Sequence, residues 1–198
     1  MIIDIGKWLL QKACQQLVDW QIWYERKLEL SINLSMKQFA LPDLVDYILE
    51  TVASFQLSSE SIKFEITETF LLHDADSIAK TLGKLREAGF RIYIDDFGTG
   101  YSSLSYLHQL PLDALKIDKS FISGSSNVKT DIVKAIISVA QSLQLEVIAE
   151  GVETLEQLHY LQGLDCDAVQ GFLFTQPLPA AQAQQLIRQP LFKLPRVS

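Results

Sequence analysis

The chain has 198 residues, which is enough for one domain with a substantial hydrophobic core. Hydrophobic residues make up 48% of the sequence and charged residues 21%, as in ordinary globular proteins. The net charge of −7 argues against DNA or an anionic membrane as the main partner, although a local metal site could attract a small phosphorylated ligand. No apolar run approaches the roughly 20 residues of a membrane span.

The few cysteines and histidines indicate a reducing compartment and argue against a zinc site. Cys14 and Cys166 are the two cysteines, far apart in a sequence that shows no signal peptide. We therefore expect buried thiols in a cytoplasmic protein, without a disulfide. The histidines His73, His108 and His159 lack the spacing of zinc ligands.

Segments with helical periodicity alternate with short β-branched runs along the chain. The sequence predicts helices over residues 5–23, 42–55, 76–87, 102–109, 127 or 130 to 143, 154–162 and 179–188. It predicts strands over residues 28–35, 62–67, 91–95, 112–118, 145–149 and 168–174. Trp8 and Trp20 on the first helix are interpreted as core residues. Short connections between alternating elements indicate parallel βαβ units, so we expect one domain over residues 1–190 and a loose tail at 191–198.

Six strand–helix units fit two architectures, a barrel short of its usual eight strands or a doubly wound open sheet. Side chains alternate between the two faces of a strand, and one polar residue near the end of each strand has the opposite parity from its apolar neighbours. Barrel geometry would bring these polar groups together at one mouth, whereas an open sheet would spread them along a line. We therefore predict an α/β fold, an incomplete TIM-type (β/α) barrel. The polar residues are Asn33, Glu65, Asp95, Lys116, Glu150 and Gln170.

The stretch IYIDDFGTG at 92–100 ends a predicted strand with two adjacent carboxylates and a glycine-rich turn. On a regular strand Asp95 and Asp96 would point to opposite faces, but a strand that ends at Asp95 would let Asp96 turn back toward the mouth. Neighbouring carboxylates are costly to keep ionised without a cation between them. The alternative interpretations are a solvated acidic turn, or salt bridges inside the barrel without a catalytic role.

The strand-end set as a whole is rich in oxygen donors, which suit Mg²⁺ or Mn²⁺ better than zinc or copper. Two such ions about 4 Å apart are used for in-line displacement at phosphorus. Lys116 could then hold an attacking water or a phosphate oxygen, and Glu150 could act as a base or a metal ligand.

Six segments resemble, in the same order, motifs of the EAL family of cyclic-di-GMP phosphodiesterases, and the resemblance covers residues 5 to 179. They are SINLS at 31–35, FEITET at 64–69, IDDFGTGYSSL at 94–104, LKIDKSFI at 115–122, IAEGVET at 148–154 and QGFLF at 170–174.

The resemblance implies a modified TIM barrel in which two Mg²⁺ or Mn²⁺ ions serve to open cyclic-di-GMP to linear pGpG. The positions that match metal ligands are Asn33, Glu65, Asp95, Asp96 and Glu150. Lys116 matches the lysine that places the water, and Glu150 also matches an assisting base. Asp118 and Gln170 match secondary positions of the site. Glu68 matches the acid that steadies the loop at 97–103, with Gly98, Thr99 and Gly100, which in the family couples metal binding to dimerisation.

The sequence also departs from the family pattern. The Glu-Ala-Leu motif, followed by Leu-Arg, belongs on a strand before the first helix, and nothing in residues 1–30 replaces it. Two family strands would lie there, which accounts for six predicted strands where eight are expected. Because that motif supplies a metal ligand and a phosphate-holding arginine, we expect weak or no activity from this chain alone. The alternatives are a non-catalytic receptor for cyclic-di-GMP or a protein-interaction module, and a remnant that only folds. Expected partners are the cyclic dinucleotide, a second copy in a homodimer, and an upstream sensory or GGDEF-type domain of a longer protein.

Overall fold

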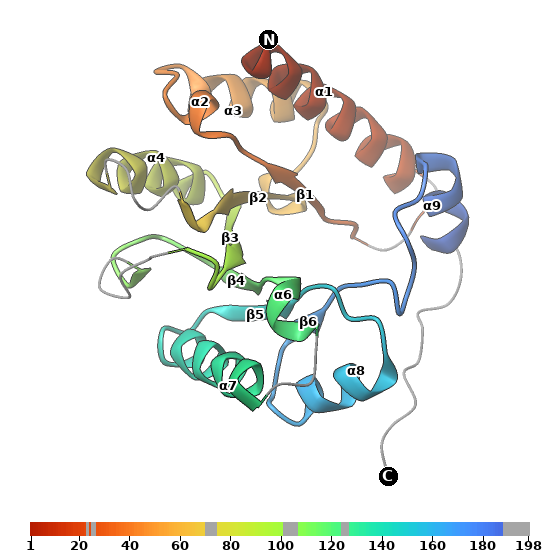
Figure 1. Cartoon of the computed structure of the whole chain (residues 1–198). Coiled ribbons are helices and arrows are strands. Elements are labelled where there is room, and N and C mark those ends of the chain that lie inside the picture. Colours follow the sequence, from red (N-terminus) through yellow and green to blue (C-terminus); the bar gives the residue numbers. More distant parts are fainter. Residues whose placement is uncertain (23, 25–26, 70–74, 101–106, 124–126, 188–198) are drawn as a thin grey trace.

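The structure, a computed structural model, describes residues 1–22, 24, 27–69, 75–100, 107–123 and 127–187. Six parallel strands form one sheet whose spatial order follows the chain. The sheet curls into a half-barrel with helices around its outside (Figure 1), which confirms the predicted incomplete TIM-type barrel. The strands are β1 (Leu30–Asn33), β2 (Ile62–Thr67), β3 (Arg91–Phe97), β4 (Ala114–Ile117), β5 (Glu146–Ala149) and β6 (Ala168–Val169).

Helices follow the strands and cover the outside of the half-barrel. Figure 1 shows α1 to α3 near β1, α4 beside β2 and β3, and α7 and α8 near β5 and β6. None of the described helices combines the length and the apolar character needed to cross a bilayer. The helices are α1 (Ile2–Gln21), α2 (Met36–Phe39), α3 (Leu44–Ser54), α4 (Ala75–Glu87), α6 (Lys119–Ile122), α7 (Asn127–Ser142), α8 (Leu155–Gln162) and α9 (Ala180–Ile187), with a 3-10 turn η1 (Ser59–Ser61).

The strands alternate between a face that packs on the helices and a face that lines the barrel interior. On β2, Ile62, Phe64 and Ile66 are fully buried against the helical layer. Phe64 packs edge-to-face on Phe90 with ring centroids 5.2 Å apart, and burying such a ring contributes about 2–3 kcal/mol. Lys116 of β4 contacts Glu65 of β2, so the polar residues between the apolar ones share the other face. The predicted parity is confirmed.

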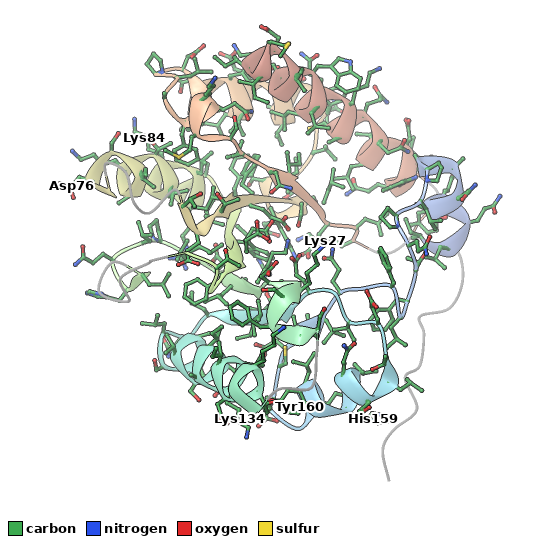
Figure 2. The ribbon with its side chains drawn as sticks, viewed as in Figure 1. Lys27, Asp76, Lys84, Lys134, His159 and Tyr160 are labelled. Carbon is green, nitrogen blue, oxygen red and sulfur yellow. The ribbon has the colours of Figure 1, made fainter. Side chains whose placement is uncertain are left out.

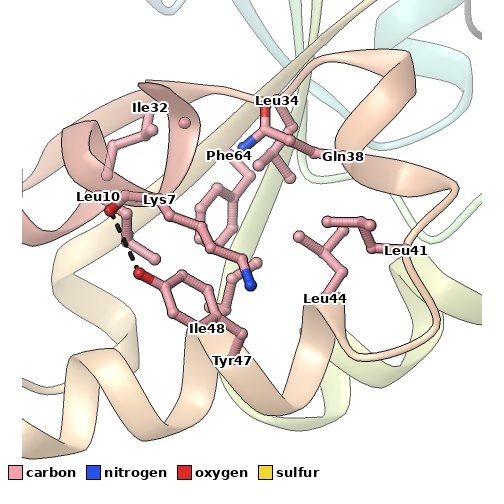
Figure 3. A pocket seen from close by; sticks show the side chains of 11 residues that line it. Lys7, Leu10, Ile32, Leu34, Gln38, Leu41, Leu44, Tyr47, Ile48 and Phe64 are labelled. Carbon is pink, nitrogen blue, oxygen red and sulfur yellow. Dashed lines mark hydrogen bonds between the residues drawn. The ribbon is translucent and has the colours of Figure 1, made fainter. Parts of the chain in front are cut away.

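Side chains from α1, α3 and β1 line a small pocket (Figure 3). A cavity of about 10 Å³ remains there, room for about one water. The Tyr47 hydroxyl donates to the Lys7 carbonyl at 3.3 Å, and the Lys7 ammonium lies 4.5 Å from the Tyr47 ring centroid. Because the cavity is small and mostly apolar, it is a packing gap and not a ligand site. On the other side of α1 the prediction of a core Trp8 is wrong, since that residue is 57% exposed.

The predicted ends of β3 and β6 are also wrong, and both involve contacts between segments far apart in the sequence. The strand predicted to stop at Asp95 continues to Phe97, and the strand predicted over 168–174 stops at Val169. A Cβ on Gly171 would lie 2.1 Å from the Val152 carbonyl oxygen, so the chain after β6 runs tightly against the loop after β5 instead of extending the sheet. Most of the helix predicted at 102–109 and the whole tail at 191–198 lie outside the described residues.

Candidate metal centre

A single ammonium group joins three strand ends at the mouth of the half-barrel. Lys116 Nζ lies 2.9 Å from Glu65 Oε2, 2.9 Å from Asp95 Oδ1 and 2.7 Å from Glu150 Oε1. Lys116 is 4% exposed, and these carboxylates come from β2, from β3 and from the residue after β5. The convergence that was predicted from strand parity is therefore present for these four side chains.

Asp96 joins this set through a bulge in β3. The pairing of β3 with β4 shifts register between Ile94 and Phe97, and Asp96 has a left-handed backbone with φ of 55°. The extra residue turns Asp96 to the side of Asp95, so that one carboxylate oxygen each from Asp95, Asp96 and Glu150 lies within 4.8 Å of the others. The strand does not end at Asp95 as predicted, but the bulge gives the same pairing of the two acids.

The donor set fits a hard divalent cation. Carboxylate oxygens are the ligands that Mg²⁺ and Mn²⁺ prefer, and here Asp95, Asp96 and Glu150 offer one each at mutual separations that an ion can bridge. Glu65, Asp95 and Glu150 surround one ammonium and Asp96 lies beside them, which leaves a negative excess that a bound cation would offset. The chemistry of the residues present therefore matches the predicted metal site.

The pKa directions reflect the same crowding of negative charge. Burial raises the pKa of Asp96, and the neighbouring charges of Asp95 and Asp118 raise it further. Burial also raises the pKa of Glu150, while its hydrogen bond with Lys116 opposes that shift. For Lys116, burial acts to lower the pKa, but hydrogen bonds to the three carboxylates outweigh it and raise the pKa. Lys116 is thus protonated at neutral pH.

Other predicted residues flank this centre. Asn33 ends the edge strand β1, in register with Glu65, and is exposed. Asp118 follows β4 and caps α6, where its carboxylate accepts a hydrogen bond from the Ser120 N–H at 3.0 Å. Burial acts to raise the pKa of Asp118, but its hydrogen bonds outweigh burial and the pKa is lowered. Gln170 follows the other edge strand, β6, is exposed, and donates its backbone N–H to the Ala149 carbonyl at 2.8 Å. Asn33 and Gln170 therefore stand at the two edges of the half-barrel.

The glycine-rich turn after Asp96 is held by the buried Glu68. One Glu68 carboxylate oxygen accepts from the Gly98 N–H at 2.8 Å and from the Gly100 N–H at 3.0 Å. The Thr99 hydroxyl donates to the Asp96 carbonyl at 2.8 Å, so the turn is also tied to a candidate ligand. This is the steadying contact that the sequence predicts for Glu68. The predicted coupling of this loop to dimerisation stays a prediction, because residues 101–106 lie outside the described part.

Two further polar residues near the centre were missed at the level of sequence. Thr67 has the same parity as Glu65 and pairs in register with Asp95, and this periodicity could have identified it. Gln157 lies on α8 but reaches α6, with its Nε2 donating to the Ile122 carbonyl at 3.2 Å. No sequence signal indicates that contact, because it joins residues far apart in the chain.

Comparison with known proteins decides the family. The model of the EAL domain family matches residues 1–177. The chain belongs to the EAL domain family. This EAL chain is 44% identical over 195 residues to the signaling protein YkoW of Bacillus subtilis, covering 96% of the chain and 24% of YkoW. It is 40% identical over 190 residues to the cyclic di-GMP phosphodiesterase NbdA of Pseudomonas aeruginosa, covering 95% of the chain and 24% of NbdA. The chain thus spans about a quarter of the length of these curated relatives.

Solved structures of EAL proteins show the same architecture. The PaMucR phosphodiesterase in complex with c-di-GMP superposes with a TM-score of 0.88 at 40% identity, covering 92% of this chain and 74% of that one. BlrP1 of Klebsiella pneumoniae, in a complex with manganese and the cyclic dinucleotide, gives a TM-score of 0.77 at 33% identity, covering 88% of this chain and 45% of that one. A BlrP1 complex with calcium matches as well. A solved structure similar to this chain is therefore known in complexes with divalent metals.

Proposed function

We propose that this EAL domain hydrolyses cyclic-di-GMP to linear pGpG with the help of Mg²⁺ or Mn²⁺. The observation that carries the proposal is the convergence of carboxylate oxygens from Asp95, Asp96 and Glu150 within 4.8 Å, beside the buried Lys116. The relative NbdA is named a cyclic di-GMP phosphodiesterase, and the PaMucR and BlrP1 structures contain the cyclic dinucleotide. These relatives support the choice of substrate.

Each residue of the centre has a role that follows from its position. Asp95, Asp96 and Glu150 would hold the cations, with Glu65 and Asn33 as further oxygen donors on the neighbouring strands. When bound, divalent cations acidify a water molecule and offset the charge that develops on phosphate oxygens. Lys116 carries a proton at neutral pH and can donate a hydrogen bond to the attacking water or to a phosphate oxygen.

Glu150 is suited to accept the proton of the attacking water. Its Oε1 lies 2.7 Å from Lys116 Nζ, the group proposed to hold the attacking water, so the carboxylate is placed within reach of that water. Asp118 and Gln170 stand near the mouth, where they would contact the substrate or support the ligands. The turn of Gly98, Thr99 and Gly100 would hold Asp96 in place through its tie to Glu68.

The alternative is a receptor that binds cyclic-di-GMP without hydrolysing it. Electrostatics disfavour binding to the metal-free site, because the ligand carries two phosphate charges and the mouth holds one ammonium against the three carboxylates that contact it and the neighbouring Asp96. Metal-independent binding, measured by calorimetry in the presence of a chelator, together with no turnover, would favour the receptor.

The test is to incubate the chain at high concentration with cyclic-di-GMP and Mn²⁺ and to look for pGpG by chromatography. Because only weak activity is expected from this chain alone, we expect slow formation of product with Mn²⁺ at this high concentration and none with a chelator. Glu150→Gln should lower the rate by about 10²–10³-fold, as the loss of one positioned electrostatic group does elsewhere. The matched control is Glu146→Gln. Glu146 begins β5, whereas Glu150 follows its other end, and the two residues have the same parity, so this variant should keep the rate. Equal rates for both variants, or no product from the unaltered chain, would refute the proposal.

The setting of the domain is also proposed from its relatives. The chain covers 27% of MucR of P. aeruginosa, a bifunctional diguanylate cyclase and phosphodiesterase. We infer that this EAL domain acts within a longer protein of cyclic-di-GMP signalling, with a GGDEF-type or sensory domain upstream, and that it works in the cytoplasm as a homodimer. Light scattering of the purified chain with and without Mn²⁺ tests the dimer.

A further inference from the structure

The one-turn helix α6 contacts two turns that carry candidate metal ligands. A Cβ on Gly98, two residues after Asp96, would lie 2.8 Å from Cε2 of Phe121. A Cβ on Gly151, next to Glu150, would lie 2.4 Å from Cβ of Lys119. Both glycines also have positive φ, 96° and 69°. The turns after β3 and β5 are therefore pressed directly against α6, closer than any other residue type allows.

The side chain of Gln157 ties the loop after β5 to the end of α6. Its Oε1 accepts from the Glu153 N–H at 2.7 Å and from the Thr154 N–H at 3.0 Å. Its Nε2 donates to the carbonyl of Ile122, the last residue of α6, at 3.2 Å. One amide group thus bridges the loop that begins with Glu150 to the helix that follows β4.

The start of α6 is fixed to the centre as well. Asp118 caps the helix through the Ser120 N–H, and it follows Lys116 by two residues. The Glu150 N–H donates to the Ile117 carbonyl at 3.1 Å, so the loop after β5 and the end of β4 are joined next to the ligands. The helix therefore contacts the segments of Asp96, Lys116 and Glu150 at once.

We propose that α6 is a bracket that sets Asp96 and Glu150 in position relative to Lys116, with Gln157 and Phe121 as its positioning residues. The inference rests on the proposed function, in which these side chains bind metal and water. Displacements of about 1 Å in such groups can lower rates by about 10²-fold. A rigid support shared by turns from separate strands would prevent such displacements. Neither Gln157 nor Phe121 is assigned any contact with the substrate.

A simpler role for Gln157 is that it only caps α8. Gln157 forms a capping box with Thr154, as Gln38 does with Ser35 at α2. Removing a cap would loosen the first turn of α8 and the amides of Glu153 and Thr154 without reaching Glu150. If Gln157 only caps α8, its removal disturbs the start of α8; if it also holds α6, its removal disturbs the backbone at Glu150 as well.

Hydrogen exchange of backbone amides separates the two roles without metal or substrate. In Gln157→Met we expect the Glu150 amide, which bonds to Ile117, to exchange about tenfold faster than in the unaltered chain. Gln157→Glu keeps an oxygen for the Glu153 and Thr154 amides but offers no donor to Ile122. We expect it to keep those two amides protected while the Glu150 amide still exchanges faster. If the Glu150 amide keeps its rate in both variants, the bracket is refuted and the capping role stands.

The matched control is Tyr160→Phe, one turn further along α8. Tyr160 lies where α8 meets α7 (Figure 2), and its hydroxyl donates to the Thr130 carbonyl at 3.0 Å. This change removes the hydrogen bond to Thr130 but keeps the ring, which lines a pocket together with Phe121 and Ile122 of α6, so the Glu150 amide should keep its exchange rate. If Tyr160→Phe accelerates it as much as Gln157→Met, the effect is general loosening and the bracket is refuted.

Turnover of cyclic-di-GMP provides the second readout. Gln157→Met should lower kcat by about tenfold and raise the Mn²⁺ concentration for half-maximal rate, with KM for the dinucleotide nearly unchanged, as expected when the support of metal ligands is lost. Tyr160→Phe should leave all of these constants unchanged. A chain that shows no turnover with Mn²⁺ would count against the proposed function, whereas an unchanged Glu150 amide would count against the bracket, so the two failures are distinct.

Discussion

Replacing Lys116 by methionine should destabilise the metal-free protein more than almost any other single change. The side chain is 4% exposed and contacts three carboxylates at 2.7–2.9 Å. Methionine has a similar volume but no charge, so the variant leaves Glu65, Asp95 and Glu150 facing one another. Removing one partner of a buried ion pair typically costs about 3–5 kcal/mol.

The expected loss can be bounded from the geometry. Each contact at about 2.8 Å is worth about 6 kcal/mol at an effective dielectric constant of about 20, but the buried ammonium has lost its hydration, which offsets much of this. We therefore expect Lys116→Met to lower the free energy of unfolding by about 3–5 kcal/mol. With a urea slope of about 2 kcal/mol per M, the midpoint should fall by about 1.5–2.5 M.

The dependence on pH and metal makes this prediction specific. Because the folded pKa of Lys116 is raised above its unfolded value of 10.5, its contribution is fully present below that value and is lost only as the pH rises through the folded pKa. The loss of unfolding free energy caused by Lys116→Met should therefore be the same at about pH 7 and about pH 9. Mn²⁺ should recover part of the loss, because a bound cation offsets the same carboxylates.

Urea unfolding followed by circular dichroism, with chelator and then with Mn²⁺, measures these effects. The matched control is Lys63→Met on β2, whose ammonium pairs with Glu29 and whose side chain is 16% exposed. That ammonium, nearer the surface and also 5.0 Å from the Tyr93 ring centroid, should cost about 1–2 kcal/mol when removed, still less than the loss expected for Lys116→Met. A loss below about 1 kcal/mol for Lys116→Met, or no recovery with Mn²⁺, would contradict the reasoning.

Three further predictions follow from the same structure. Glu68→Ala leaves the Gly98 and Gly100 amides without their acceptor, so thermal unfolding should show a loss of about 2–4 kcal/mol in stability. The same variant should need a higher Mn²⁺ concentration for turnover. Glu68→Gln keeps an acceptor and should lose less stability. Burial and the charges of Asp95 and Asp118 raise the pKa of Asp96 in the folded protein above its ordinary value of 3.8. The favourable contribution of its protonated form to stability is therefore present below pH 3.8 and is lost as the pH rises through the folded pKa. Asp96→Asn should thus stabilise the metal-free protein at about pH 7, and the gain should be less than about 1 kcal/mol because the side chain is partly exposed. Urea titrations should show that this gain in unfolding free energy shrinks toward about pH 4. Burial raises the pKa of Cys14 to about 11 and the thiol is fully buried, so a thiol reagent at about pH 8 should label it only after unfolding; rapid labelling of the native protein would contradict this.

Strand parity could be predicted from the sequence because it depends on local alternation alone. The apolar run around Phe64 gave β2 its observed bounds, and the polar residues between apolar ones placed Glu65, Lys116 and Glu150 on one face. Convergence at one mouth then followed from the closure of parallel strands into a barrel. These steps need no knowledge of contacts between distant residues.

The remaining features depend on such contacts. The bulge at Asp96 arises where β3 shifts register against β4, and an Asp-Asp pair is equally compatible with a strand end. The short β6 reflects the close approach of Gly171 to Val152. The bridge from Gln157 to Ile122 spans 35 residues, so no local pattern indicates it.

The match between spatial order and chain order has a consequence for how the domain assembles. Register partners are never far apart along the polypeptide, since Ile148 pairs with Ala168 and Leu30 pairs with Ile62. Each of the described strands from β2 to β6 can therefore dock on its predecessor as soon as it emerges from the ribosome. A destabilising substitution in one strand–helix unit should therefore loosen the units next to it first, as it does in repeat proteins.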